Sequence, residues 1–183
     1  MSLPDKTKQR NTVIFLIGFM GAGKTTVGQA LARHLHYEFR DLDRLIEARA
    51  GKSVAEIFAE SGEPEFRRLE NETIQTCRDL THAVVALGGG AYTSEENRLL
   101  LRSIGTTVWL DCPLRICLRR ISSDPSRPLL GDENEMSELL ERRRAAYALA
   151  DHIVRTGKLS PRQLVIEISR TLAIDPKDHS ALR

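Results

Sequence analysis

A glycine-rich loop between an apolar run and a helical stretch constrains this chain more than any other feature. Residues 18–25 read Gly-Phe-Met-Gly-Ala-Gly-Lys-Thr and fit the pattern G-x-x-x-x-G-K-[ST]. The loop leaves the apolar run 13–17 and enters a stretch, 25–35, whose apolar residues recur at helical spacing. Glycines let backbone N–H groups surround an anion, and a helix N-terminus adds a favourable dipole. A chance match to this pattern would rarely stand between a strand and a helix. The loop therefore predicts a site for a nucleoside triphosphate.

The remaining residues alternate short β-rich runs with helical stretches. We expect strands at 13–17, 37–40, 84–87, 107–110 and 152–154, and helices at 25–35, 43–50, 53–60, 64–79, 94–103, from 113 onward, and at 160–173. This alternation predicts an α/β fold of three layers, α/β/α, with a central five-stranded parallel sheet. We expect one domain over residues 1–183, with a core at about 12–173 and flexible tails. Residues 122–133, rich in proline and without a core-facing period, predict a mobile lid.

Composition excludes several classes of protein. The net charge of +2 is too small to favour nucleic acid or a membrane as the main partner. The polar N-terminal stretch has no apolar segment of the kind found in a secretory signal, and no run approaches the roughly 20 residues that span a bilayer. Three cysteines without a CxxC spacing fit reduced, packed thiols and argue against zinc. We therefore expect a cytoplasmic protein, and a monomer, since no apolar surface stripe calls for a partner.

The first loop assigns the nucleotide side of the reaction. Lys24 would reach the β- and γ-phosphates of ATP, and the Thr25 hydroxyl would bind Mg²⁺. The expected ATP-binding residues of this loop are Gly21, Ala22, Gly23, Lys24, Thr25 and Thr26. The chain lacks the N-K-x-D motif of switch GTPases and is too short for a large motor ATPase. A small chain with a flap between two helices therefore points to a kinase of a small molecule.

Two aspartates follow the expected second strand, at the edge where ligands of open parallel sheets bind. Alternation along an extended segment puts the carboxylates of Asp41 and Asp43 on the same side. Asp41 can hold Mg²⁺ through water, and Asp43 can accept a hydrogen bond from an attacking hydroxyl. Capping of the next helix is a second interpretation of Asp43, and the two are compatible.

Two arginines are further candidates. Arg67 and Glu70 are three residues apart and share a helix face, so the acid can orient the guanidinium; a solvated salt bridge is the alternative. Arg143 and Tyr147 show the same adjacency inside a basic run that is most simply a solvated face.

Three consecutive glycines, Gly88–Gly90, follow the expected third strand. They lack the following Lys-Ser/Thr of a phosphate loop, so they are not a second phosphate loop.

Taken together, these motifs resemble the shikimate kinase family. The segments GFMGAGKTTVG, DLD, GEPEFRRLE, ALGGGA, SRPLL and RRAAY occur in the order and spacing of that family, from about residue 13 to about residue 172. The resemblance implies that ATP phosphorylates the 3-hydroxyl of shikimate, a step of aromatic amino-acid biosynthesis. It implies that shikimate is bound by Asp43, Arg67, Gly88, Gly89, Gly90 and Arg143. Absent side chains at the glycines would let the ring lie close to the backbone, with the amides of Gly89 and Gly90 facing its carboxylate or a hydroxyl.

The same resemblance assigns the nucleotide and metal positions. Lys24, Thr25 and Asp41 match the phosphate and Mg²⁺ positions, Arg127 matches a lid arginine over the phosphates, and Arg120 matches the residue that packs on adenine. Asp43, Lys24 and Arg127 are the expected catalytic residues.

The chain departs from the family pattern at one point that affects the site. The family often has Arg-x-Pro-Leu-Tyr where residues 143–147 read Arg-Arg-Ala-Ala-Tyr, so Arg144 competes with Arg143 for the carboxylate. Three other functions stay open at this level: a kinase of another hydroxy-acid such as gluconate, a nucleoside monophosphate kinase, and a silent nucleotide-binding regulator. Intact Lys24, Asp43 and Arg127 argue against the last of these.

Overall fold

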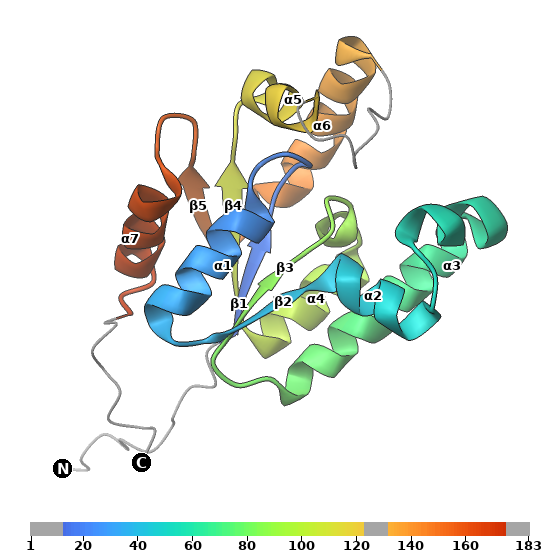
Figure 1. Ribbon diagram of the computed structural model, residues 1–183, viewed down its shortest axis with the longest axis horizontal. Coiled ribbons are helices and arrows are strands. Elements are labelled where there is room, and N and C mark those ends of the chain that lie inside the picture. Colours follow the sequence, from blue (N-terminus) through green and yellow to red (C-terminus); the bar gives the residue numbers. More distant parts are fainter. Residues whose placement is uncertain (1–12, 123–131, 175–183) are drawn as a thin grey trace.

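The computed structural model describes residues 13–122 and 132–174, which build a five-stranded parallel sheet with helices on both faces (Figure 1). The strands are β1 (Val13–Ile17), β2 (Glu38–Asp41), β3 (Ala83–Ala86), β4 (Thr106–Asp111) and β5 (His152–Arg155). Their order across the sheet is β2-β3-β1-β4-β5. The α/β class and the five parallel strands predicted from the sequence are thus confirmed.

Seven α-helices and two short 3₁₀ turns connect the strands in the described ranges. They are α1 (Lys24–Leu35), α2 (Leu42–Ala50), α3 (Val54–Thr76), η1 (Cys77–Asp79), η2 (Ala91–Thr93), α4 (Glu95–Ile104), α5 (Leu114–Ser122), α6 (Glu133–Tyr147) and α7 (Pro161–Thr171). Helices α1 and α7 pack against each other, and α3 packs against α4 (Figure 1). Both β1 and β3 are buried along their whole length, as a parallel strand covered on two faces requires.

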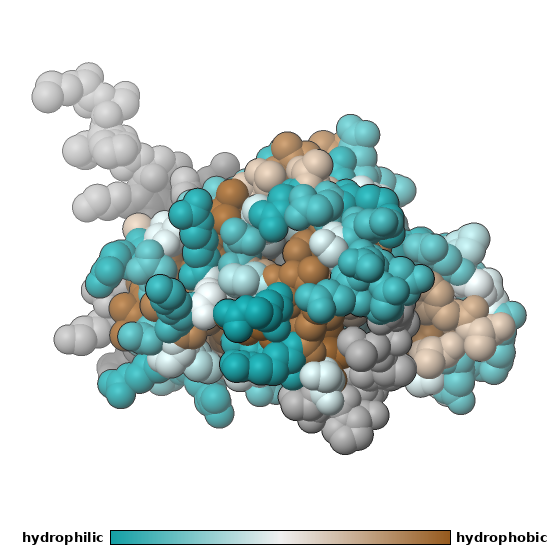
Figure 2. Space-filling view, turned by 90° about the horizontal axis from the view of Figure 1, so that it is seen from above, coloured by the Kyte–Doolittle hydropathy of each residue, from teal (hydrophilic) through white to brown (hydrophobic). Residues whose placement is uncertain are grey.

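The register of the strands brings three polar segments to one edge. Leu16 of β1 and Asp41 of β2 both pair with Ala86 of β3. The loop after β1, the two aspartates at the junction of β2 with α2, and the glycines after β3 therefore lie at one level of the sheet edge. Figure 2 views the molecule from this side and shows mainly hydrophilic residues around a smaller hydrophobic area.

Helix α3 differs most from the sequence-based expectation. The expected helices at 53–60 and 64–79 form one element interrupted at Gly62, whose φ of 76° is not helical, and the last residues form the 3₁₀ turn η1. Ser53 caps the first segment through a capping box with Glu56. Pro64 is tolerated because the interruption at Gly62 places it in the first turn of a new segment.

Two of the sequence-based predictions fall outside the described residues. Residues 123–131 of the expected lid, including Arg127, are among them, as are the expected tails. In residues 13–122 and 132–174, no helix is long and apolar enough to cross a membrane.

Candidate active site

The loop after β1 needs glycine for steric reasons. Gly21 has a φ of 73°, and a β-carbon there would lie 2.6 Å from the carbonyl oxygen of Cys117. Gly23, at a φ of 95°, is the N-cap of α1. A side chain at either position would be strained or would clash, so the backbone of the loop stays bare where an anion approaches.

The charged and hydroxylic residues of this loop hold defined partners. Lys24 Nζ donates to the carbonyl oxygens of Gly18 and Phe19, at 2.8 and 3.0 Å. Thr25 Oγ1 donates to Asp41 Oδ2 at 2.9 Å. The hydroxyl and carboxylate that the sequence proposes for Mg²⁺ are therefore adjacent, although they belong to different elements.

Arg120 lies against the same loop. Its Nη1 donates to the carbonyl oxygens of Gly21 and Ala22, both at 3.2 Å. The sequence predicts that Arg120 packs on adenine, and that role stays a prediction. In the structure its guanidinium binds the phosphate loop itself.

Each of the three consecutive glycines faces a different charged side chain. A β-carbon added at Gly88 would lie 2.7 Å from Asp43 Oδ1, and one at Gly90 would lie 2.5 Å from Arg67 Nη2. The corresponding distance from Gly89 to Arg143 Nη1 is 3.1 Å. The space that these glycines leave open is thus bordered by the aspartate and both arginines that the sequence assigns to the acceptor.

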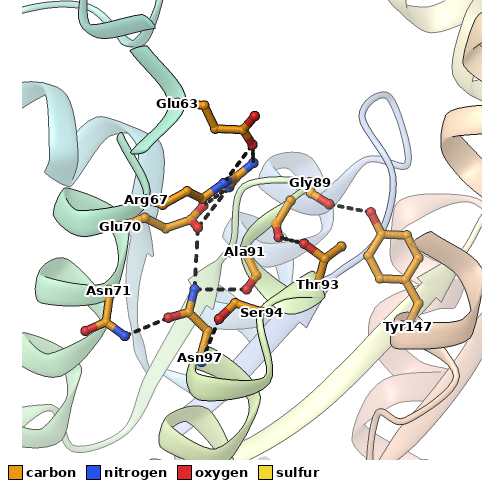
Figure 3. Close-up of polar contacts among 11 residues, drawn as sticks. Glu63, Arg67, Glu70, Asn71, Gly89, Ala91, Thr93, Ser94, Asn97 and Tyr147 are labelled. Atoms are coloured by element: carbon orange, nitrogen blue, oxygen red, sulfur yellow. Dashed lines mark hydrogen bonds and ion pairs between the residues drawn. The ribbon is translucent and has the colours of Figure 1, made fainter. Parts of the chain in front are cut away.

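Arg67 is held by two acids on its own helix (Figure 3). Its Nη1 donates to both oxygens of Glu70, at 3.1 and 2.9 Å, and its Nη2 donates to Glu63 at 2.9 Å. Glu70 is fully buried, and burial raises the pKa of its carboxyl, while Arg67 opposes that rise. Because Glu70 is buried and Arg67 is partly exposed, the pair can orient the guanidinium and is not the fully solvated salt bridge that was the alternative.

The carbonyl oxygens of the three glycines all accept hydrogen bonds from the protein. Those of Gly88 and Gly90 accept hydrogen bonds from the Ala91 and Thr93 amides, at 3.2 and 3.0 Å. That of Gly89 accepts from the Tyr147 hydroxyl at 2.5 Å (Figure 3). Burial raises the pKa of Tyr147 to about 12, so its phenol stays a donor at neutral pH.

The structure separates the two adjacent arginines of α6. Arg143 lies beside Gly89, with its guanidinium carbon 6.0 Å from the centre of the Phe19 ring. Arg144 instead contacts Glu141 at 3.2 Å and stacks over Trp109 at 5.9 Å. Of the two, Arg143 is the one on the glycine side.

Sequence reasoning missed several residues that shape this site. Asn97 links Glu70 to the segment after the glycines, and the Tyr147 hydroxyl anchors Gly89. Tyr147 is noticeable in the sequence only as a neighbour of Arg143 on a helix. Nothing in the sequence distinguishes Asn97 from an ordinary polar residue in the first turn of a helix.

A phosphate loop on a parallel sheet, beside a glycine segment that is bordered by one acid and two arginines, defines a P-loop kinase of a small molecule. A family model described as shikimate kinase matches residues 20–173. The curated shikimate kinases of Geobacter sulfurreducens and Persephonella marina are 45% and 43% identical to this chain; the alignments cover 92% and 85% of it and 93% and 95% of those proteins. The chain belongs to the shikimate kinase family.

A solved structure agrees with the sequence comparison. The shikimate kinase of Acinetobacter baumannii, determined in complex with shikimate, matches with a TM-score of 0.82 at 37% identity. The match covers 88% of this chain and 93% of that one. A sugar kinase from Janibacter, at 18% identity and a TM-score of 0.61, shares the fold alone.

Proposed function

We propose that this enzyme transfers the γ-phosphoryl group of ATP to the 3-hydroxyl of shikimate, giving shikimate 3-phosphate and ADP. One observation carries the proposal: Asp43, Arg67 and Arg143 converge on the glycine segment. Shikimate presents one carboxylate and three hydroxyls, and this site offers two guanidinium groups and one carboxylate. The relative from Acinetobacter baumannii, solved with shikimate, supports the same acceptor.

The two arginines are suited to the acceptor carboxylate. A charge-assisted hydrogen bond contributes roughly 1.5–3 kcal/mol, and two cations on different helices can fix both the position and the tilt of the ring. Arg67 is pre-oriented by Glu70, so it loses little side-chain freedom on binding. Among the described residues, no acceptor binds the amides of Gly89 and Gly90, which supports their role as donors to the substrate.

Asp43 would act on the attacking hydroxyl. It lies in the first turn of α2, facing Gly88, on the same edge of the sheet as the phosphate loop. Its carboxylate would accept the proton of the 3-hydroxyl as the oxygen attacks the γ-phosphorus. Lys24, and Arg127 outside the described residues, would neutralise the charge on the phosphate oxygens, which is most of what phosphoryl transfer requires.

The residues near the phosphate loop fit a magnesium ion. The Thr25 hydroxyl and the Asp41 carboxylate are hard oxygen donors 2.9 Å apart. The described residues contain no cluster of three or more His, Cys, Asp or Glu, so water and phosphate oxygens would complete the shell. A Mg²⁺ ion held there would supply positive charge that reduces the negative charge of the phosphate groups. Thr25 and Asp41 would hold it on the loop.

A coupled assay of ADP release tests the acceptor. Shikimate, gluconate and nucleoside monophosphates are supplied separately with ATP and Mg²⁺, each beside a reaction without acceptor. We expect shikimate alone to raise ADP release far above the control. Equal release with and without shikimate would refute the proposal, and stimulation by gluconate would identify a kinase of another hydroxy-acid. Light scattering of the same sample tests the monomer that we also propose.

A further inference from the structure

Asn97 is a buried polar residue that the proposed reaction does not yet use. It lies in the first turn of α4 and is only 2% exposed. Its Nδ2 donates to the Ala91 carbonyl at 3.0 Å and to Glu70 Oε2 at 3.4 Å. Its Oδ1 accepts from Asn71 Nδ2 at 2.9 Å (Figure 3). A buried amide with this many defined partners is costly to place unless all of them are satisfied.

The contacts of Asn97 allow only one orientation of its amide. Turned by half a rotation, Oδ1 would face the Ala91 carbonyl and the Glu70 carboxylate, both of which are acceptors. Nδ2 would then face the Asn71 amide nitrogen, which is a donor. The partners therefore fix the NH₂ group between Ala91 and Glu70.

This NH₂ group connects the two sides of the proposed acceptor site, the Arg67 side and the glycine side. On one side it contacts Glu70, which holds Arg67 through both carboxylate oxygens. On the other side it holds the carbonyl of Ala91, the residue directly after Gly90. Gly90 and Arg67 are already in close approach, so a small shift of either side would change the place of the guanidinium.

We propose that Asn97 is a positioning residue for the acceptor, setting the place of Arg67 relative to the glycine segment through Glu70 and Ala91. This inference rests on the proposed function, because it concerns the site assigned to shikimate. The side chain of Asn97 is buried and its contacts are with Glu70, Ala91 and Asn71, so we assign it no direct contact with the acceptor or ATP. Its loss acts on acceptor binding through Arg67, and it leaves the phosphate loop in place.

The substitution Asn97→Asp tests the donor role at almost unchanged volume. It puts a carboxylate oxygen against Glu70 Oε2 and the Ala91 carbonyl, replacing two attractive contacts by repulsive ones. We expect the KM for shikimate to rise about tenfold, while the KM for ATP changes less than twofold. Asn71→Ala is the matched control: it removes the hydrogen bond from α3 to Asn97 Oδ1, and leaves in place the bonds of Asn97 Nδ2 to Glu70 and Ala91. Its two KM values should stay within twofold of the wild type.

A polarity swap separates positioning from mere folding. Glu70→Gln alone turns an amide NH₂ group against a donor, either Arg67 Nη1 or Asn97 Nδ2, and we expect it to weaken shikimate binding as well. In the double variant Glu70→Gln/Asn97→Asp, the amide introduced on α3 can donate to the carboxylate introduced on α4. We expect the fold increase in the shikimate KM of this double variant to be at least fivefold smaller than the product of the fold increases in the two single variants.

The outcomes decide between the alternatives. Multiplicative effects in the double variant, or equal rises of both KM values in Asn97→Asp, would overturn the inference. If Asn97→Asp does not fold, Asn97→Ala replaces it, with the same expected split between shikimate and ATP. Wild-type enzyme that fails to use shikimate in this assay would refute the proposed function instead, so the two failures are distinguishable.

Discussion

Gly90 and Arg67 occupy complementary space: a β-carbon on the glycine would lie 2.5 Å from Nη2 of the arginine. That atom is a guanidinium nitrogen held by Glu63, so it cannot move away without breaking an ion pair. We expect Gly90→Ala to raise the KM for shikimate at least tenfold and to change the KM for ATP less than twofold. Steady-state kinetics with each substrate varied in turn measures both.

The neighbouring glycines give a graded series. Gly88→Ala, at 2.7 Å from Asp43 Oδ1, should lower kcat as well, whereas Gly89→Ala, at 3.1 Å from Arg143, should have the smallest effect. Gly51→Ala is the control, because an added β-carbon there meets nothing within 4 Å. Its φ of +66° strains an alanine, however, so the backbone cost is present without a clash. It should cost about 1 kcal/mol of stability with both KM values unchanged. A uniform loss of ATP affinity across the series would contradict a wall specific to the acceptor.

Asp43→Asn tests the proposed base. The amide keeps the shape of the side chain but cannot take the proton, so we expect kcat to fall by about 10²–10⁴. The dissociation constant of ATP, measured by calorimetry, should change less than twofold. A collapse of nucleotide affinity would place Asp43 in the metal site instead.

Three arginine variants test which cations bind the carboxylate. Loss of a charge-assisted bond should raise the KM for shikimate roughly 10- to 150-fold in Arg67→Ala and Arg143→Ala, with little change for ATP. Arg144→Ala should leave it within twofold, because Arg144 contacts Glu141 and Trp109. A larger rise of the shikimate KM in Arg144→Ala than in Arg143→Ala would show that Arg144 binds the acceptor carboxylate.

Tyr147 predicts a stability change at high pH. Burial raises its pKa to about 12 from an ordinary value of 10.0, so the unfolded chain loses the phenolic proton first. The contribution to stability is complete below about pH 10 and disappears as the pH rises to about 12. Urea titrations should show the wild type losing about 2–3 kcal/mol more than Tyr147→Phe over this interval. Parallel losses in the two proteins would mean that the phenol titrates normally.

The sequence predicted the parts of this molecule that local pattern encodes. The phosphate loop needs a fixed spacing of glycines before a lysine, and buried parallel strands need continuous apolar runs, so both are visible along the chain. The order of the strands is not, because pairing joins residues far apart in sequence. The observed ends of strands and helices differ from the predicted ends by one to three residues, because the last backbone hydrogen bond depends on neighbouring segments.

The site shows the same division. Asp43, Arg67 and the three glycines were named from their motifs, but the sequence did not show that each glycine lies against a different charged side chain. Asn97 escaped notice because its partners, Asn71 and Glu70, lie 26 and 27 residues earlier in the chain. Arg143 and Arg144 could not be separated because the direction of a helical side chain depends on packing, which only the folded chain defines.

The identity of the phosphorylated atom tests the proposed acceptor site most directly. Wild-type enzyme is incubated with ATP, Mg²⁺ and shikimate, and the product is characterised by proton–phosphorus correlation NMR. If Asp43 selects the attacking hydroxyl while Arg67 and Arg143 hold the carboxylate, the phosphorus couples to the proton on carbon 3 of the ring. Phosphate on another ring hydroxyl, or no phosphorylated shikimate at all, would contradict it.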